Sequence, residues 1–196
     1  MQKKQCTSRQ LQAIKTKNKI YDAALELISK EGFDNVTVES ISKSAGVSVG
    51  AFYHHFASKD DVFYATYKEL DDYLNKEETL KRLKSDKQFD NIVEFFKIYA
   101  EFQVYRGLTA VRHLFSAQNK LFSDRHRTLF VMLEKFVKEG KESGEFSSEY
   151  PDQVIIEYFM VIARGTVYNW CVDSGEYDLP ERMVQNFEMT RNVFIK

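Results

Sequence analysis

Helix-breaking residues are scarce in this 196-residue sequence, which has only 8 glycines and 2 prolines. Folds made of many short strands need frequent tight turns, and these two residues supply most of them, so an all-β fold is disfavoured. Cysteine is equally rare, because Cys6 and Cys171 are the only two and lie far apart. This usage argues against a disulfide framework and favours a reducing compartment, the cytoplasm.

Long apolar runs and catalytic motifs are also missing. The N-terminus lacks the apolar segment of a secretory signal peptide. The longest apolar stretch, Val154 to Val172, is interrupted by Glu157, Arg164 and Asn169, so it predicts a buried helix and no contact with a membrane. We find no nucleophile–base pair, metal-ligand cluster or glycine-rich phosphate loop. We therefore expect no enzymatic activity, no cofactor and no metal site.

Charge is nearly balanced over the whole chain, with a net charge of −1, but it is unevenly distributed. Residues 1–60 carry 9 basic and 6 acidic side chains, a net of +3, whereas residues 61–196 carry 19 and 23, a net of −4. The first 21 residues hold six basic groups and no acidic one. Such an arm either binds phosphate or is a solvated tail.

Apolar residues recur at helical spacing along most of the chain. Near the N-terminus the pattern predicts a helix over 10–30, a second from Thr37 to the stop at Gly46, a third from 49 to about 56 and a fourth from 58 to about 75. After a polar stretch over 76–90, further helices are expected over 91–106, 108–119, 124–143, 151–173 and 180–195.

Three helices, the last two joined by a tight glycine turn, make a helix-turn-helix. We therefore predict an all-α fold class, with an N-terminal three-helix helix-turn-helix domain over 1–62 and a larger C-terminal helical domain over 63–196. The boundary falls inside the fourth helix.

The third helix has two contrasting faces at 100° per residue. Its core face is apolar and consists of Val49, Phe52 and Phe56. Its opposite face is small and polar and consists of Gly50, Ala51 and His54. Tyr53 and His55 stand on either side of the core face.

Such a helix fits the major groove of DNA. Small residues allow close approach, Ala51 can touch a thymine methyl group, and His54 can bond to base edges. Tyr53 and His55 can reach phosphates on the two walls. Lys59, in the first turn of the next helix, can bind phosphate together with that helix's free N–H groups.

Two other interpretations of the same helix stay open at this point. It can be a capped surface helix that happens to expose aromatic rings. It can also carry a metal ligand, although adjacent histidines point about 100° apart and chelate one ion poorly, and no third ligand is near in sequence.

The stretch Ile20–Phe63 resembles the DNA-binding domain of the tetracycline-repressor (TetR) family. The resemblance is carried by A-x-x-L-I-x-x-x-G-F in the first helix, T-V-x-x-I in the second, and A-G-V-S followed by F-Y-x-x-F-x-S-K-x-x-V-F. It implies that the third helix reads the major groove and that Tyr53 and Lys59 contact phosphate. Val49 stands where many members have a polar residue. The expected DNA-binding residues are Thr37, Ser48, Val49, Gly50, Ala51, Tyr53, His54, His55 and Lys59.

The resemblance also implies that the C-terminal domain dimerises through its last two long helices and holds a small-molecule effector. The apolar stretch 154–172 supports a dimer independently, because a helix that is apolar nearly all round must be covered on most sides. The expected dimerisation residues are Tyr158, Ile162, Val167, Trp170, Met183, Phe187 and Phe194. Simple core packing is the alternative for both helices.

An effector site is expected where aromatic residues are mixed with a few polar ones, around 95–115. Arg164 is added because an arginine inside a buried helix needs a carboxylate such as Glu157 or an anionic ligand. The expected effector-binding residues are Phe96, Tyr99, Phe102, Gln103, Arg106, Arg112, His113 and Arg164. Ordinary core packing with solvent-facing arginines is the alternative.

Together these inferences predict a TetR-type regulator that binds double-stranded, palindromic operator DNA as a homodimer. It is expected to be a repressor released by a small-molecule effector whose identity the sequence does not give. The alternatives are an activator of the same fold and, in another class, an all-α ligand-binding protein or enzyme with a vestigial DNA-binding module.

Overall fold

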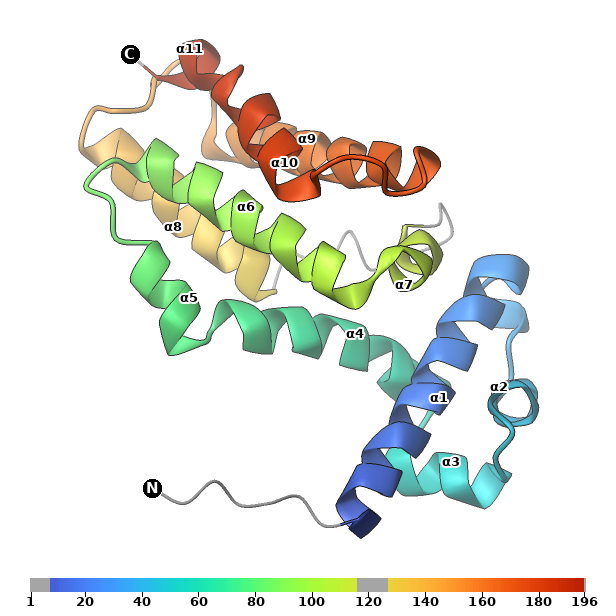
Figure 1. The fold of residues 1–196 in the computed structure, drawn as a ribbon. Coiled ribbons are helices and arrows are strands. Elements are labelled where there is room, and N and C mark those ends of the chain that lie inside the picture. Colours follow the sequence, from blue (N-terminus) through green and yellow to red (C-terminus); the bar gives the residue numbers. More distant parts are fainter. Residues whose placement is uncertain (1–7, 116–126, 196) are drawn as a thin grey trace. The chain divides into compact units, whose positions relative to one another are not determined.

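In the computed structural model the chain is helical through most of residues 8–115 and 127–195, the part that the structure describes (Figure 1). The chain divides into two compact units. Residues 1–67 and 113–119 form the first unit, and residues 68–112 and 120–196 form the second. This division falls inside the fourth helix, and the predicted domains 1–62 and 63–196 stay a prediction.

The first unit consists of α1 (Ser8–Glu31), the short 3₁₀ helix η1 (Phe33–Asn35), α2 (Val38–Ala45), α3 (Val49–His55) and the first turns of α4 (Lys59–Leu74). Its core is formed by large apolar side chains from every one of these α-helices. They include Ile20, Ala24, Ile41, Phe52 and Val62, all fully buried. The helices α1, α2 and α3 contact one another, which confirms the predicted helix-turn-helix.

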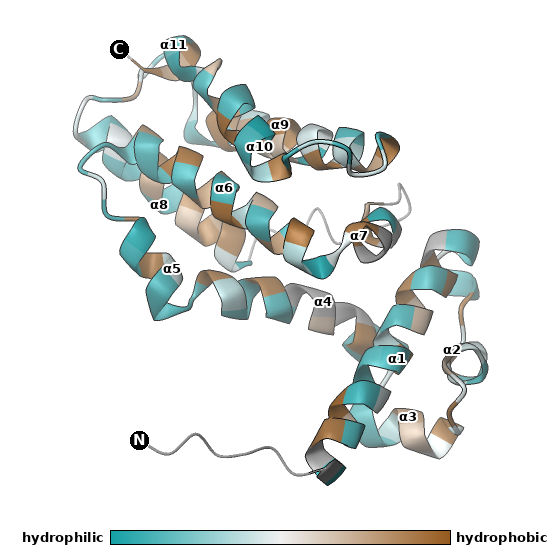
Figure 2. Cartoon of the chain, in the orientation of Figure 1, coloured by the Kyte–Doolittle hydropathy of each residue, from teal (hydrophilic) through white to brown (hydrophobic). Residues whose placement is uncertain are grey.

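The second unit is built around α6 (Gln88–Arg106), which contacts α5 (Glu77–Arg82), α8 (Thr128–Glu142), α9 (Asp152–Val172) and α10 (Leu179–Glu188). Hydrophobic and hydrophilic residues alternate along α6 (Figure 2). The rings of Phe96 and Phe187 stack with centroids 4.3 Å apart, and Phe159 lies against Phe187. The remaining helices are α7 (Leu108–Leu114) and α11 (Arg191–Phe194).

Three predicted boundaries in the second unit are corrected. The stretch 76–90 contains α5, which buries only Thr79 and so gives no apolar pattern. Helix α6 begins at Gln88, not 91, because the Glu145 carboxylate accepts from the N–H groups of Gln88 and Phe89 at 2.7 and 3.1 Å. The predicted helix 180–195 breaks after Glu188, where the Thr190 hydroxyl donates to the carbonyl of Phe187. Residues 116–119 of the predicted helix 108–119 and residues 124–126 of the predicted helix 124–143 lie outside the part that the structure describes.

Candidate nucleic-acid interface

The turn between α2 and α3 is set by local side chain and backbone contacts. Gly46 ends α2 in the left-handed region, with φ of 66°, a conformation that glycine adopts without steric cost. The Ser48 hydroxyl then accepts from the N–H of Ala51 at 3.1 Å and caps α3. Thr37 and Ser40 form a reciprocal capping box at the start of α2. Thr37 and Ser48 thus hold the ends of the two helices.

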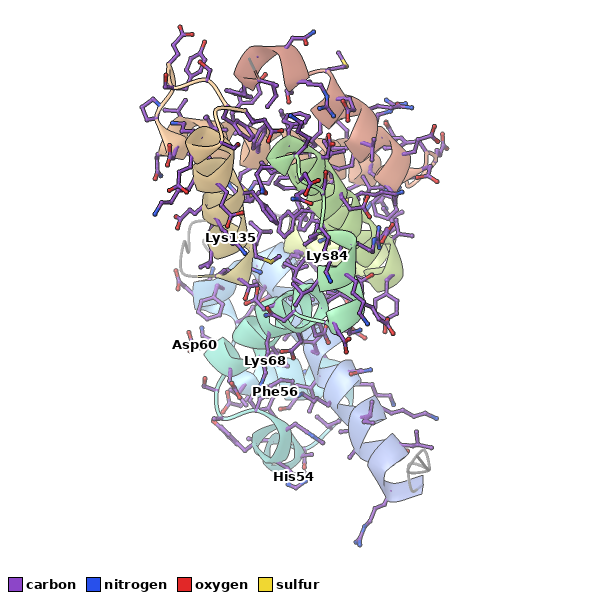
Figure 3. The ribbon with its side chains drawn as sticks, turned by 90° about the vertical axis from the view of Figure 1, so that its left-hand side faces the viewer. His54, Phe56, Asp60, Lys68, Lys84 and Lys135 are labelled. Atoms are coloured by element: carbon purple, nitrogen blue, oxygen red, sulfur yellow. The ribbon has the colours of Figure 1, made fainter. Side chains whose placement is uncertain are left out.

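Helix α3 buries one face and presents the other to solvent. Phe52 and Phe56 are buried, whereas Tyr53 is 55% exposed and His54 is exposed. Figure 3 shows the His54 side chain at the outer edge of the first unit. Gly50 is exposed too, and a Cβ atom there would meet only the Ser48 hydroxyl, at 3.9 Å. Val49 is also exposed, so it lies outside the core stripe to which the sequence assigned it.

The basic half of α1 adjoins the C-terminal end of α3. The Lys17 ammonium lies 5.4 Å from the centroid of the Phe56 ring. Burial lowers the pKa of His55 below its usual 6.5, and the nearby charges of His54 and Lys17 lower it further. Arg9, Lys15 and Lys19 are exposed on the same helix. The basic N-terminal segment was predicted, but the proximity of Lys17 to the end of α3 was not.

Lys59 has an internal contact that the sequence did not predict. Its ammonium donates to the carbonyls of Phe33 and Val36 at 2.8 and 3.0 Å and lies 4.5 Å from the centroid of the Phe33 ring. It therefore ties the start of α4 to η1. An ammonium has three N–H donors, so one donor is left over from these two bonds. Its contact with phosphate stays a prediction.

The comparison with protein families rests on this same region. Residues 20–66 match the family model of bacterial regulatory proteins of the tetR family. The matched range runs from the core of α1 through the capped turn and α3 into α4. Residues 20–66 are therefore assigned to the tetR family of bacterial regulatory proteins.

Curated relatives agree with that assignment. IcaR of Staphylococcus aureus (strain Newman), a negative transcriptional regulator of the biofilm operon icaADBC, is 34% identical over 79 residues, which cover 40% of this chain and 42% of IcaR. The chain thus matches less than half of the length of IcaR. The fatty acid metabolism regulator protein of Bacillus subtilis (strain 168) is 26% identical over 170 residues, covering 82% of this chain and 86% of the relative.

Solved structures of the tetR family share the fold of the whole chain. A tetR family regulator from Shewanella sp. PV-4 superposes with a TM-score of 0.68 at 17% identity, covering 92% of this chain and 98% of that one. FadR from Bacillus subtilis, solved in complex with stearoyl-CoA, gives a TM-score of 0.66 at 19% identity, covering 88% and 96%. At these identities the likeness establishes the fold alone.

The predicted effector-binding residues have different environments in the second unit. Phe96, Tyr99, Phe102 and Gln103 are buried on α6. The Arg106 guanidinium pairs with Glu69 of α4. Arg112 is exposed, and its guanidinium donates to the Cys171 carbonyl at 2.8 and 3.0 Å and to the Ser174 hydroxyl. Arg112 therefore holds the end of α9. The side chain of His113 lies outside the described part, and Arg164 is half-buried on α9.

Five of the predicted dimerisation residues are buried within a single chain. They are Val167, Trp170, Met183, Phe187 and Phe194. The Trp170 indole N–H, for example, donates to the Tyr177 carbonyl at 3.1 Å. These five pack the core of their own unit and are not available to a partner surface. Tyr158 is exposed and Ile162 is half-buried.

The exposed side of α9 instead carries a row of large apolar side chains. We call it the α9 row, and it consists of Val154, Tyr158, Val161, Tyr168 and Val172. The spacing is four, three, seven and four residues, with the exposed Gly165 between Val161 and Tyr168. This 3.5-residue repeat is the spacing of a helix that packs lengthwise on another helix.

No group of three or more His, Cys, Asp or Glu side chains within residues 8–115 and 127–195 is arranged to hold a metal ion. Over the same residues, none of the helices combines the length and the apolar character that a membrane span requires.

Proposed function

We propose that this chain is a TetR-type transcriptional repressor that binds a two-fold symmetric operator as a homodimer and dissociates from it when a small molecule binds. The observation that carries the proposal is the exposed face of α3, held by the Ser48 cap in the region that matches the tetR family model. IcaR, which matches this region, is a negative transcriptional regulator. We infer that this chain, too, is a negative regulator of transcription.

The proposed contacts with DNA follow from exposure. Gly50 and Ala51 at the start of α3 allow the helix to enter the major groove, where His54 faces the base edges. Tyr53 and His55 reach phosphates, which position the domain without reading sequence. Lys17 extends this surface onto α1, because its ammonium lies beside Phe56 at the end of α3.

The proposed dimer forms through the α9 row. Its side chains expose apolar surface along one helix face, and contiguous patches of that kind mark interaction sites. In a two-fold dimer the same row packs on its copy. A dimer then presents two α3 helices to two successive major grooves, which matches a palindromic operator. Its mass is twice 23.0 kDa, about 46 kDa.

The proposed effector is a small molecule that enters the core of the second unit. FadR from Bacillus subtilis was solved with stearoyl-CoA and SmeT with triclosan. Stearoyl-CoA carries a long apolar alkyl chain and triclosan is a largely apolar molecule, and the aromatic side chains of α6 would suit such an apolar group. Binding would favour a conformation in which the two α3 helices no longer match the operator.

Fluorescence anisotropy with DNA from upstream of the protein's own coding region tests the proposal, with random DNA of equal length as the control. We expect specific binding at least about 10³-fold tighter than binding to random DNA. Affinity should fall steeply with salt, since phosphate contacts release counterions. Equal affinity for the two DNAs across the salt series would contradict the proposal. Light scattering should return the dimer mass.

A further inference from the structure

Two polar side chains on α6, those of Tyr99 and Gln103, are buried in the core of the second unit. The Tyr99 side chain is 4% exposed and the Gln103 side chain 1%. They lie one helical turn apart, on the same face. Gln103 Oε1 is buried and accepts no hydrogen bond from a described group. Buried polar groups in folded proteins are nearly always bonded, so this amide requires an explanation.

Two arginines on neighbouring helices act electrostatically on Tyr99. Arg127 lies at the start of α8 and Arg164 lies on α9, and both helices contact α6. Guanidinium nitrogens of both arginines are buried. The Arg127 guanidinium also lies 3.7 Å from the Asp71 carboxylate. We call Tyr99, Gln103, Arg127 and Arg164 the buried polar cluster.

The charges of Arg127 and Arg164 partly oppose the effect of burial on Tyr99. Burial raises the pKa of the Tyr99 phenol to about 12, while the charges of Arg127 and Arg164 act in the opposite direction. The two cations therefore stabilise an anion at the position of the phenol oxygen, although Tyr99 itself stays neutral at physiological pH. A ligand anion placed beside that oxygen would be stabilised by the same field.

Apolar surface continues from the cluster along α6. Phe96 lies one turn before Tyr99 on the same face, with the two ring centroids 6.2 Å apart. Phe102 is buried next to Gln103. A molecule with its charged end at Tyr99 and Gln103 would therefore find aromatic side chains within a turn of the helix.

We infer that the buried polar cluster receives the carboxylate of an amphipathic monocarboxylic acid, and that this class of molecule is the effector. The inference rests on the proposed function, because it assigns the chemistry of the effector proposed there. The Tyr99 hydroxyl and the amide N–H of Gln103 would donate to the carboxylate. The amide orientation is free to serve this purpose, since its oxygen and nitrogen exchange places by rotation. Arg127 and Arg164 would supply charge.

Isothermal titration calorimetry of the full chain, with matched probes, tests this inference. Decanoate represents alkyl acids and 3-phenylpropanoate represents aryl acids. Decanol and methyl decanoate are the controls, because they have the same alkyl chain as decanoate but no charge. We expect at least one acid to bind about tenfold tighter than the neutral probes and to release operator DNA. Equal binding of acid and neutral probes, or no binding of either acid, would overturn the inference. Stearoyl-CoA binding without either acid would overturn it too.

Conservative variants locate the binding site. Tyr99→Phe removes one hydroxyl and should weaken binding of the better acid about tenfold, with binding of decanol unchanged. Tyr105→Phe is the matched control, because Tyr105 is on the same helix and 82% exposed. An unchanged affinity for the acid in Tyr99→Phe would show that the head group binds elsewhere.

Gln103→Met separates a ligand site from a structural bond. If the amide serves the ligand, the variant without ligand should have an unchanged or higher melting temperature, since an unbonded buried amide has been replaced by an apolar group. Acid binding should fall about tenfold. A lower melting temperature with unchanged acid binding would assign Gln103 to the core. If the acid does not bind but the protein binds its operator specifically, only this inference is wrong. If the protein shows no specific DNA binding, the proposed function is wrong.

Discussion

The two units of the chain distribute polar and apolar side chains in opposite ways. In the first unit the apolar residues Phe52 and Phe56 are buried, while Tyr53 and His54 face solvent. In the second unit, Tyr99 and Gln103 are buried, with Gln103 Oε1 unbonded to any described group, while Val161 on α9 is 66% exposed. The first arrangement follows the ordinary rule for a folded domain, and the second departs from it twice.

The difference shows which surfaces carry a free-energy cost in the isolated chain. The polar side chains on α3 are exposed and hydrated, so this surface carries no such cost. An exposed apolar row and an unbonded buried amide are both unfavourable until something covers or bonds them. These two features are the basis on which we propose a second copy at the α9 row and a ligand near Gln103.

Disrupting the α9 row should produce the largest effect. Val161→Glu places a carboxylate in the proposed dimer contact, and burying an unpaired charge there is strongly unfavourable. We expect the dimer dissociation constant to rise at least about 100-fold, about 2.7 kcal/mol, with loss of operator binding. Analytical ultracentrifugation across a concentration series measures this.

The control for that experiment is Val131→Glu, which introduces the same charge at a valine that is 54% exposed on α8, away from the row. It should leave the dimer intact. If both variants dimerise like the wild type, the α9 row is not the interface. If both dissociate, the effect is one of net charge.

Sequence signals within a few residues of each other predicted the first unit well. The caps Thr37 and Ser48 and the stop at Gly46 act over three or four residues, and all three are confirmed. The contact of Lys59 with Phe33 and Val36 joins positions 23 and 26 residues apart. No local pattern indicates it, because both acceptors are backbone carbonyls, which every residue has.

The second unit was less predictable for a different reason. Helix α9 is apolar on several faces, so the periodicity of its sequence does not show which face packs on the core of the second unit and which face stays exposed. Val167 and Trp170, which were predicted for the dimer, are buried within the chain, whereas the exposed Val154 and Val161 were not among the predicted residues. Helix α5 was missed because it buries little, and only its contacts with α6 reveal its place.

Removing a ring from the exposed face of α3 should have the next largest effect. Tyr53→Ala should weaken operator binding about tenfold or more, about 1.4 kcal/mol, because a phosphate contact is lost on each half of the site. The melting temperature should stay unchanged, since the ring is largely exposed. Tyr105→Ala, in the second unit, is the matched control. Unchanged DNA affinity in Tyr53→Ala would show that this side of α3 does not face phosphate.

Lys59→Met distinguishes an internal tie from a phosphate contact. Loss of the bonds to Phe33 and Val36 should destabilise the protein by about 1 kcal/mol, measured as a lower melting temperature. Lys43→Met, at an exposed lysine on α2, should have no such effect. If Lys59 also binds phosphate, the log–log salt slope of DNA binding becomes shallower by about 2 per dimer. An unchanged melting temperature would contradict the internal role.

The smallest expected effect is the pH dependence that His55 adds to the first unit. Burial, His54 and Lys17 lower its pKa below 6.5 in the folded state. The unfolded chain then takes up a proton at a higher pH than the folded chain does, so stability falls as pH drops from 6.5 toward the folded pKa. DNA phosphates act oppositely, since they favour the protonated ring, and affinity should rise over the same range. His55→Gln should flatten the pH dependence of stability, measured by urea unfolding, and the pH dependence of DNA affinity, measured by anisotropy. Lys17→Gln should reduce the pH dependence of stability without removing it. A stability that increases toward low pH in the wild type, and stays so in His55→Gln, would contradict the assignment.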